Sequence, residues 1–133
     1  MPLRIAPGWL VSYNRFYEGR PDLARTPTDD ADYFTQDMLQ LNSCRRGTGG
    51  EWEIDPTGFL IDLGWYPDSD PDGTYRLVVV SPDFRGEELF EIEHRDPVLI
   101  RDIIGVCTTM LAVKADLSDL IEQIHHMVST GPL

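Results

Sequence analysis

The sequence has little of what marks a secreted, membrane-spanning or metal-bound protein. It holds two cysteines in 133 residues, Cys44 and Cys107, which are too few for a disulfide scaffold and lack the spacing of metal ligands. No apolar run reaches the roughly 18 residues of a membrane span, and the N-terminus lacks the apolar stretch of a signal peptide. We therefore expect one soluble, cytoplasmic domain over residues 1–133, bound to no membrane and holding no metal or cofactor.

Basic residues are also scarce, since 11 lysines and arginines stand against 23 acidic residues and leave a net charge of −12. Eighteen of the acids lie within residues 18–93, which hold six arginines. A field of this sign repels nucleic acid and anionic membranes and attracts cationic partners. We therefore expect no nucleic-acid partner. The acidity could also serve solubility alone.

Apolar residues alternate along several segments, as they do in strands with one buried face. The alternation is clearest at residues 59–66 and 75–80, and a third such strand is predicted at residues 89–94. Residues 34–41 fit either a short helix or an edge strand, and we favour the strand. Residues 9–17 alternate too, with one side formed by Trp9, Val11, Tyr13 and Tyr17.

Turn residues separate these strands. Residues 19–32 are predicted to form a loop, and the three glycines of residues 43–50 predict a flexible turn. Asp70-Pro71-Asp72-Gly73 predicts a type I turn, because proline presets the torsion of the second position. The glycine would then accept the left-handed torsion of a following bulge. The flanking strands should therefore form a hairpin.

From Asp96 onward the apolar period becomes that of a helix. Asp96 fits the N-cap and Pro97 the first helical position, and a second helix should begin at Asp116 or Ser118. The apolar stripe of the first helix comprises Leu99, Ile100, Ile103, Ile104, Cys107, Met110 and Leu111. Strands followed by helices predict an α+β fold, an antiparallel sheet with two C-terminal helices packed on one face. The uncovered face is the natural place for function.

No motif of an enzyme active site is present. Asp68, Asp70 and Asp72 are spaced like the first ligands of a calcium loop, but the twelfth position holds Val79 where that loop needs glutamate. We therefore expect no metal site there. His94 is the remaining candidate for an acid or base, although a buried or helix-capping role is more common for such a residue. We expect no enzyme, and keep catalysis by His94 with a nearby carboxylate as an alternative.

Aromatic residues with acidic neighbours are frequent anchors of protein interfaces. Trp52 stands between Glu51 and Glu53, and Tyr66 comes shortly before the acidic turn. Both aromatics could equally pack inside the protein. Trp65 shares the parity of the predicted core, which favours burial.

Several short motifs resemble those of small acidic bacterial proteins. They are Gly8-Trp9…Tyr13-Asn14…Phe16-Tyr17, then Asp37-Met38-Leu39-Gln40, then Ile61-Asp62-Leu63-Gly64-Trp65-Tyr66-Pro67-Asp68…Asp70…Gly73-Thr74-Tyr75-Arg76-Leu77. Over about residues 8–95 the chain is thus similar to immunity proteins of contact-dependent growth inhibition and related polymorphic toxin systems. The resemblance implies a cytoplasmic antidote that binds a cognate toxin domain and blocks its active site. It transfers no binding position, since such proteins use different surfaces against different toxins.

Many such toxins are nucleases with basic clefts, and an acidic surface that imitates phosphate would enter such a cleft. We expect the contacts at the hairpin tip (Asp68, Asp70 and Asp72), and as second choices at Asp29, Asp30 and Asp32 and at the Glu51-Trp52-Glu53 group, with Tyr66 as a further aromatic. The main alternative is an acidic secretion chaperone, usually dimeric, with an apolar groove for an extended partner.

Overall fold

The computed structural model describes residues 3–14, 16, 38–67 and 70–130. The predicted loop with Asp29, Asp30 and Asp32, and Asp68 of the hairpin tip, lie outside the described residues. The elements placed are β1 (Trp9–Asn14), β2 (Leu39–Arg46), β3 (Trp52–Ile54), β4 (Leu60–Tyr66), β5 (Thr74–Ser81), β6 (Glu87–His94), α1 (Pro97–Ala112) and α2 (Leu117–Thr130). Strands precede helices, so the α+β class is confirmed.

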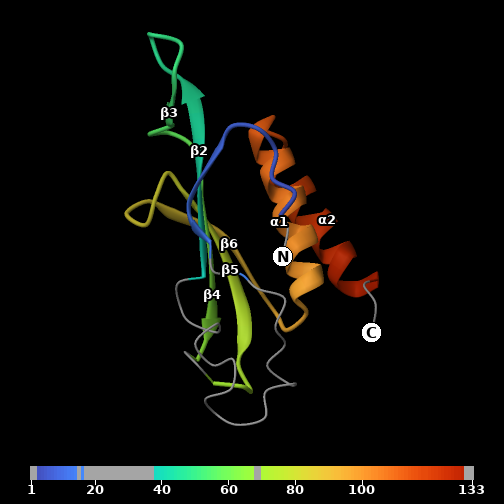
Figure 1. The fold of residues 1–133 in the computed structure, drawn as a ribbon. Coiled ribbons are helices and arrows are strands. Elements are labelled where there is room, and N and C mark those ends of the chain that lie inside the picture. Colours follow the sequence, from blue (N-terminus) through green and yellow to red (C-terminus); the bar gives the residue numbers. More distant parts are fainter. Residues whose placement is uncertain (1–2, 15, 17–37, 68–69, 131–133) are drawn as a thin grey trace.

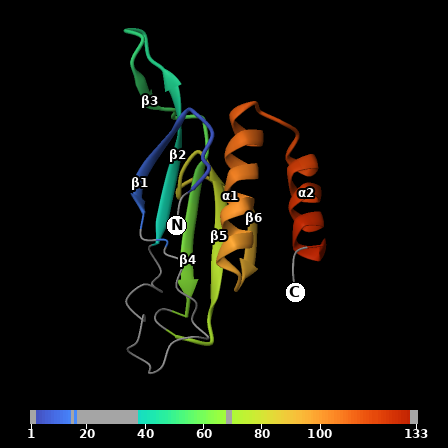
Figure 2. The same cartoon turned by 45° about the vertical axis from the view of Figure 1, so that its right-hand side comes forward.

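The strands form one antiparallel sheet in the order β1-β2-β4-β5-β6, and β3 pairs with the far end of β2. Figures 1 and 2 show α1 and α2 side by side on one face of this sheet. No element among the described residues covers the opposite face, which we call the helix-free face. The predicted two-layer arrangement is therefore confirmed. No helix in the described part of the chain is long and apolar enough to cross a membrane.

The hydrophobic core lies between the sheet and the helices. Trp65 and Tyr75 are fully buried there, and their rings meet edge to face at a centroid distance of 4.9 Å. Phe16 meets Tyr75 in the same way at 5.4 Å. Burial of an apolar side chain of this kind contributes about 1.5–3 kcal/mol, so Trp65 is a core residue, as its parity predicted.

The cap of α1 agrees with the sequence prediction. The carboxylate of Asp96 accepts a hydrogen bond from the backbone N–H of Val98 at 2.9 Å, and Pro97 opens the helix. α2 begins at Leu117, with the Asp116 carboxylate accepting from the backbone N–H of Ser118 at 2.8 Å. The predicted stripe of α1 is buried in the core, except that Met110 is half-buried.

The turn between β4 and β5 is confirmed by the hydrogen bond from the Gly73 N–H to the Asp70 carbonyl, at 3.0 Å. The prediction that Gly73 adopts a left-handed torsion is wrong, because its φ lies outside that region. Glycine is needed here for space: an added Cβ would lie 2.5 Å from the Tyr66 carbonyl oxygen and 2.7 Å from Nε1 of Trp65. Position 73 therefore has no room for a side chain.

Two details of β1 and β2 differ from the predictions. β2 continues to Arg46, so the predicted turn at residues 43–50 is partly strand, because β3 offers those residues a partner. In β1 a bulge at Ser12 shifts the register, and Tyr13 pairs with Gln40 on the helix-free face. The uniform parity predicted for Trp9, Val11 and Tyr13 is therefore broken, and Tyr17 lies outside the described residues.

Candidate functional site

The register of the sheet gathers acidic side chains on the helix-free face, because directly paired residues share a face. Asp62 and Glu91 flank Val78 in one row of cross-strand partners. Glu88 and Glu93 lie in the rows on either side. The three glutamates are exposed and Asp62 is half-buried. We call these four residues the acidic stripe, which runs from β4 to the edge strand β6.

Arg76 lies within this stripe and is tied to its neighbours. Its Nη2 donates to Oε2 of Glu91 at 2.7 Å, and its guanidinium lies 5.3 Å from the ring centre of Tyr66. This hydrogen bond to Glu91 raises the pKa of Arg76 above its ordinary value. Tyr66, predicted as an interface residue, is thus half-buried on the helix-free face beneath a charged partner. Among the residues that the structure describes, one arginine within the stripe stands against four carboxylates, which leaves this part of the face acidic.

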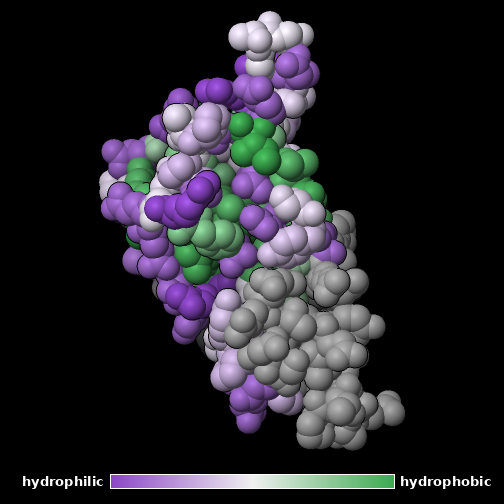
Figure 3. All heavy atoms as spheres, turned by 90° about the vertical axis from the view of Figure 1, so that its left-hand side faces the viewer, coloured by the Kyte–Doolittle hydropathy of each residue, from purple (hydrophilic) through white to green (hydrophobic). Residues whose placement is uncertain are grey.

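A groove of about 820 Å³ opens on the helix-free face as well, between β3 and the turn that joins β5 to β6. We call it the side groove; the residues that define it are Ile54, Pro56, Pro82 and Phe84 on its walls, with Asn42 and Leu60 on its floor. Ile54 is 51% exposed and Phe84 62% exposed. Figure 3 looks at this side of the molecule and shows hydrophobic patches surrounded by hydrophilic residues. Such an exposed apolar surface with a polar border is typical of an interaction site.

Two carboxylates border the side groove and stay ionised. Asp55 accepts from the backbone N–H and the hydroxyl of Thr57, at 2.9 and 2.8 Å, and these bonds lower its pKa. Asp83 accepts from the backbone N–H of Arg85 at 2.8 Å, which lowers the pKa of Asp83. Each has an arginine nearby: Arg45 lies 3.9 Å from Asp55, and the Arg85 side chain lies 3.4 Å from Asp83. Both carboxylates therefore remain anionic at any physiological pH.

The predicted Glu51-Trp52-Glu53 group forms part of the β2–β3 hairpin. Trp52 is 52% exposed, with the guanidinium of Arg46 stacked 4.2 Å from its ring centre. Glu53 accepts from Nε of Arg45 at 3.1 Å. Trp52 is therefore a surface aromatic, available to a partner, and two arginines partly neutralise the acids around it.

Asp70 and Asp72 lie at the opposite end of the sheet from that hairpin, because β4 runs from one to the other (Figure 1). The Asp70 carboxylate accepts from the backbone N–H of Asp72 at 2.9 Å, and Asp72 is exposed. The structure thus does not bring the two predicted acidic groups into one site. The acidic stripe lies on the strands between them, and its signal in the sequence was the outward parity of Glu91 and Glu93.

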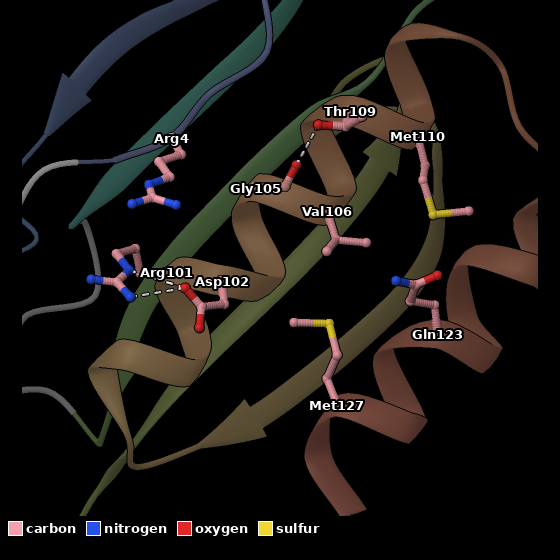
Figure 4. Close-up of a pocket in the computed structure, with 9 residues that line it drawn as sticks. All are labelled: Arg4, Arg101, Asp102, Gly105, Val106, Thr109, Met110, Gln123 and Met127. Carbon is pink, nitrogen blue, oxygen red and sulfur yellow. Dashed lines mark hydrogen bonds and ion pairs between the residues drawn. The ribbon is translucent and has the colours of Figure 1, made fainter. Parts of the chain in front are cut away.

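A second cavity, of about 430 Å³, opens on the helix layer (Figure 4). Met110 and Val106 of α1 and Met127 of α2 extend into the space between the two helices. Arg4 and Arg101 lie at its other side, where Nη2 of Arg101 donates to Asp102 at 3.0 Å. The cavity is an apolar groove with one charged end.

His94 and the two cysteines have structural roles or surroundings in the described part of the chain. Nδ1 of His94 accepts from the backbone N–H of Asp96 at 2.9 Å, which helps to set the start of α1. Burial raises the pKa of the Cys107 thiol to about 12 and also raises that of Cys44. The described residues contain no group of three or more His, Cys, Asp or Glu side chains placed to hold a metal ion.

Comparisons of the chain with protein-family models, with curated proteins and with solved structures gave no match. The function is therefore inferred from the residues and the geometry of the helix-free face.

Proposed function

We propose that this protein is a cytoplasmic immunity protein, which binds a cognate toxin domain and blocks its active site through an acidic surface. The toxin that best suits this surface is a nuclease with a basic substrate cleft. The observation that supports the proposal is the acidic stripe of Asp62, Glu88, Glu91 and Glu93, set on a sheet face that no described helix covers.

The stripe is suited to such a cleft in charge and in form. Its three glutamates are exposed on an edge strand, and a bulge between Glu88 and Phe90 keeps Glu88 on the same face as Glu91 and Glu93. Their carboxylates can therefore be approached along β6. A row of carboxylates on a firm sheet resembles the repeated charges of a phosphate backbone, against which a nuclease cleft is built. The same charges speed the encounter with a basic partner.

The first test is biological. An antidote is normally encoded beside its toxin, so the C-terminal domain of the product encoded immediately upstream is expressed in cells with and without this protein. We expect growth arrest that this protein relieves. A harmless neighbour, or an arrest that this protein fails to relieve, would count against immunity.

The second test assigns the surface. In the purified pair, the double variant Glu88→Gln/Glu93→Gln should associate more slowly and show a weaker salt dependence, because two charges near the cleft are gone. Glu91 is left intact, so its ion pair with Arg76 is unaffected. The double variant Asp119→Asn/Glu122→Gln removes the same charge from exposed positions of α2 and serves as the matched control. Equal slowing by both variants would reject the acidic stripe as the contact surface.

One observation favours a secretion chaperone as a second candidate. The groove between α1 and α2 is lined by Met110 and Met127, and methionine is adaptable enough to accept varied apolar partners. A chaperone of this kind is usually a dimer. Light scattering on the purified protein distinguishes the two candidates, since a strict monomer speaks against the chaperone.

A further inference from the structure

We propose that the side groove binds an arginine side chain of a basic protein segment. The inference deepens the proposed function, on which it rests for the identity of the partner. For the chemistry of the groove it rests on the residues that form it: apolar walls, two fixed carboxylates at the border and an amide-bearing floor.

The walls suit the long stem of a cationic side chain. Ile54 and Pro56 stand on one side, and Pro82 and Phe84 on the other. Lysine and arginine bury their methylene groups along such apolar surfaces while the charged head remains in a polar setting. A short apolar side chain would make no use of the carboxylates at the border, whereas a cationic one contacts the walls and the border together.

The border supplies the charge. Asp55 and Asp83 are both held ionised by hydrogen bonds within their own turns. Their present cationic neighbours are loosely placed, since the Arg85 side chain is 93% exposed and Arg45 is shared with Glu53. The Arg85–Asp83 pair is exposed and therefore weak, and the Arg45–Asp55 pair is long at 3.9 Å. An incoming guanidinium can therefore compete with these arginines or join them.

Arginine is favoured over lysine by the aromatic wall and by the floor. A guanidinium stacks on an aromatic face and is less strongly hydrated than an ammonium group. The exposed ring of Phe84 offers such a face, and the side-chain amides of Gln40 and Asn42 offer hydrogen-bond acceptors at the floor. Arginines of the protein already lie over rings in this way, at Trp52, Tyr66 and Trp65.

The groove is also continuous with the acidic stripe. Leu60 of its floor pairs with Val80, and Val80 pairs in turn with Glu88. Asp62 lies two residues beyond Leu60 on the same strand and the same face. A basic segment seated by one arginine in the groove would thus continue over carboxylates.

The experiment uses defined probes, an acetylated and amidated hexa-arginine peptide and its hexalysine counterpart. Binding to the full chain is followed by calorimetry at low and moderate salt, and by amide shifts in NMR spectra. We expect hexa-arginine to bind more tightly than hexalysine and to shift residues 82–86 and Leu60. The wall variant Ile54→Ser/Phe84→Ser should weaken hexa-arginine binding about tenfold or more, since two apolar contacts are lost.

The matched control is Val113→Ser/Val128→Ser, which removes two exposed apolar side chains from the helix layer and should leave binding unchanged. A second variant, Asp55→Asn/Asp83→Asn, keeps the side-chain acceptors of both turns and removes the charge. It should weaken binding more than Asp119→Asn/Glu122→Gln, which carries the same change of charge.

Two results would overturn the inference. One is equal binding by the wild type and the wall variant, because the acidic stripe would then account for all the affinity. The other is no binding of hexa-arginine at low salt. If the growth assay fails while hexa-arginine still binds in the groove, the proposed immunity function is rejected and the arginine site is kept. If the wall variant still rescues growth and binds the toxin with unchanged affinity, the groove is rejected as a toxin contact and the immunity function is kept.

Discussion

The indole Nε1 of Trp65 donates a hydrogen bond to the backbone carbonyl of Asp70, 2.6 Å away, and so joins the buried core to the acidic turn between β4 and β5. Arg95 holds the same turn from the side of α1. It donates to the carbonyls of Pro71, at 3.1 Å, and of Gly73, and it lies 5.6 Å from the centre of the Trp65 ring. The turn is thus fixed by bonds from two other parts of the fold.

We expect Trp65→Phe to lower the free energy of unfolding by about 1–3 kcal/mol, through loss of the hydrogen bond and of core packing. Urea unfolding measures this change. Trp52→Phe is the control, because Trp52 is 52% exposed and its truncation should change stability little. Similar losses in both variants would contradict the bracing role of Trp65.

A second prediction concerns the start of α1. Asp96→Ala removes the acceptor of the Val98 N–H and should lower the free energy of unfolding by about 1 kcal/mol. Asp96→Asn retains a side-chain oxygen at the cap and should cost less. If urea unfolding shows the same loss of unfolding free energy for both variants, the stabilisation comes from the charge of Asp96 and not from its capping hydrogen bond.

A third prediction uses the buried thiol of Cys107. Burial raises its pKa from the ordinary value of 9.0 to about 12, so the thiol stays neutral in the folded protein while the unfolded chain ionises above 9.0. The contribution of Cys107 to stability is therefore complete below pH 9.0 and is lost as pH rises toward about 12. Cys107→Ala removes this dependence. The difference in unfolding free energy between wild type and variant should shrink from about pH 9 upward, and a difference that stays constant would refute the shift.

The two helices and the β4–β5 hairpin could be predicted because each repeats its pattern over several turns or residue pairs. β3 could not, since its three exposed residues give no period, and it changed the boundary of β2. The sequence identified Gly73 as a turn residue. The structural reason for glycine there is the close approach of the Tyr66 carbonyl, which a local sequence pattern does not reveal. The acidic stripe was half visible in the outward parity of Glu91 and Glu93. The side groove could not be predicted from the sequence, because its residues, among them Asn42, Ile54 and Phe84, are far apart in the chain and meet only through the order of the strands.

A last prediction separates contact from long-range attraction at the hairpin tip. Asp68→Asn/Asp70→Asn/Asp72→Asn removes three charges while an asparagine at 70 can still accept from the N–H of residue 72. If the tip touches the toxin, both the association rate and the dissociation rate should change, because contacts act on dissociation and the field acts on association. We expect both to change, by stopped-flow measurement at two salt concentrations. A slower association with an unchanged dissociation rate would place the tip outside the interface. The decrease in the salt dependence of the association rate would then measure how much the tip adds to the electrostatic attraction of the toxin. Rates and salt dependence both unaltered would reject the hairpin tip as a binding element.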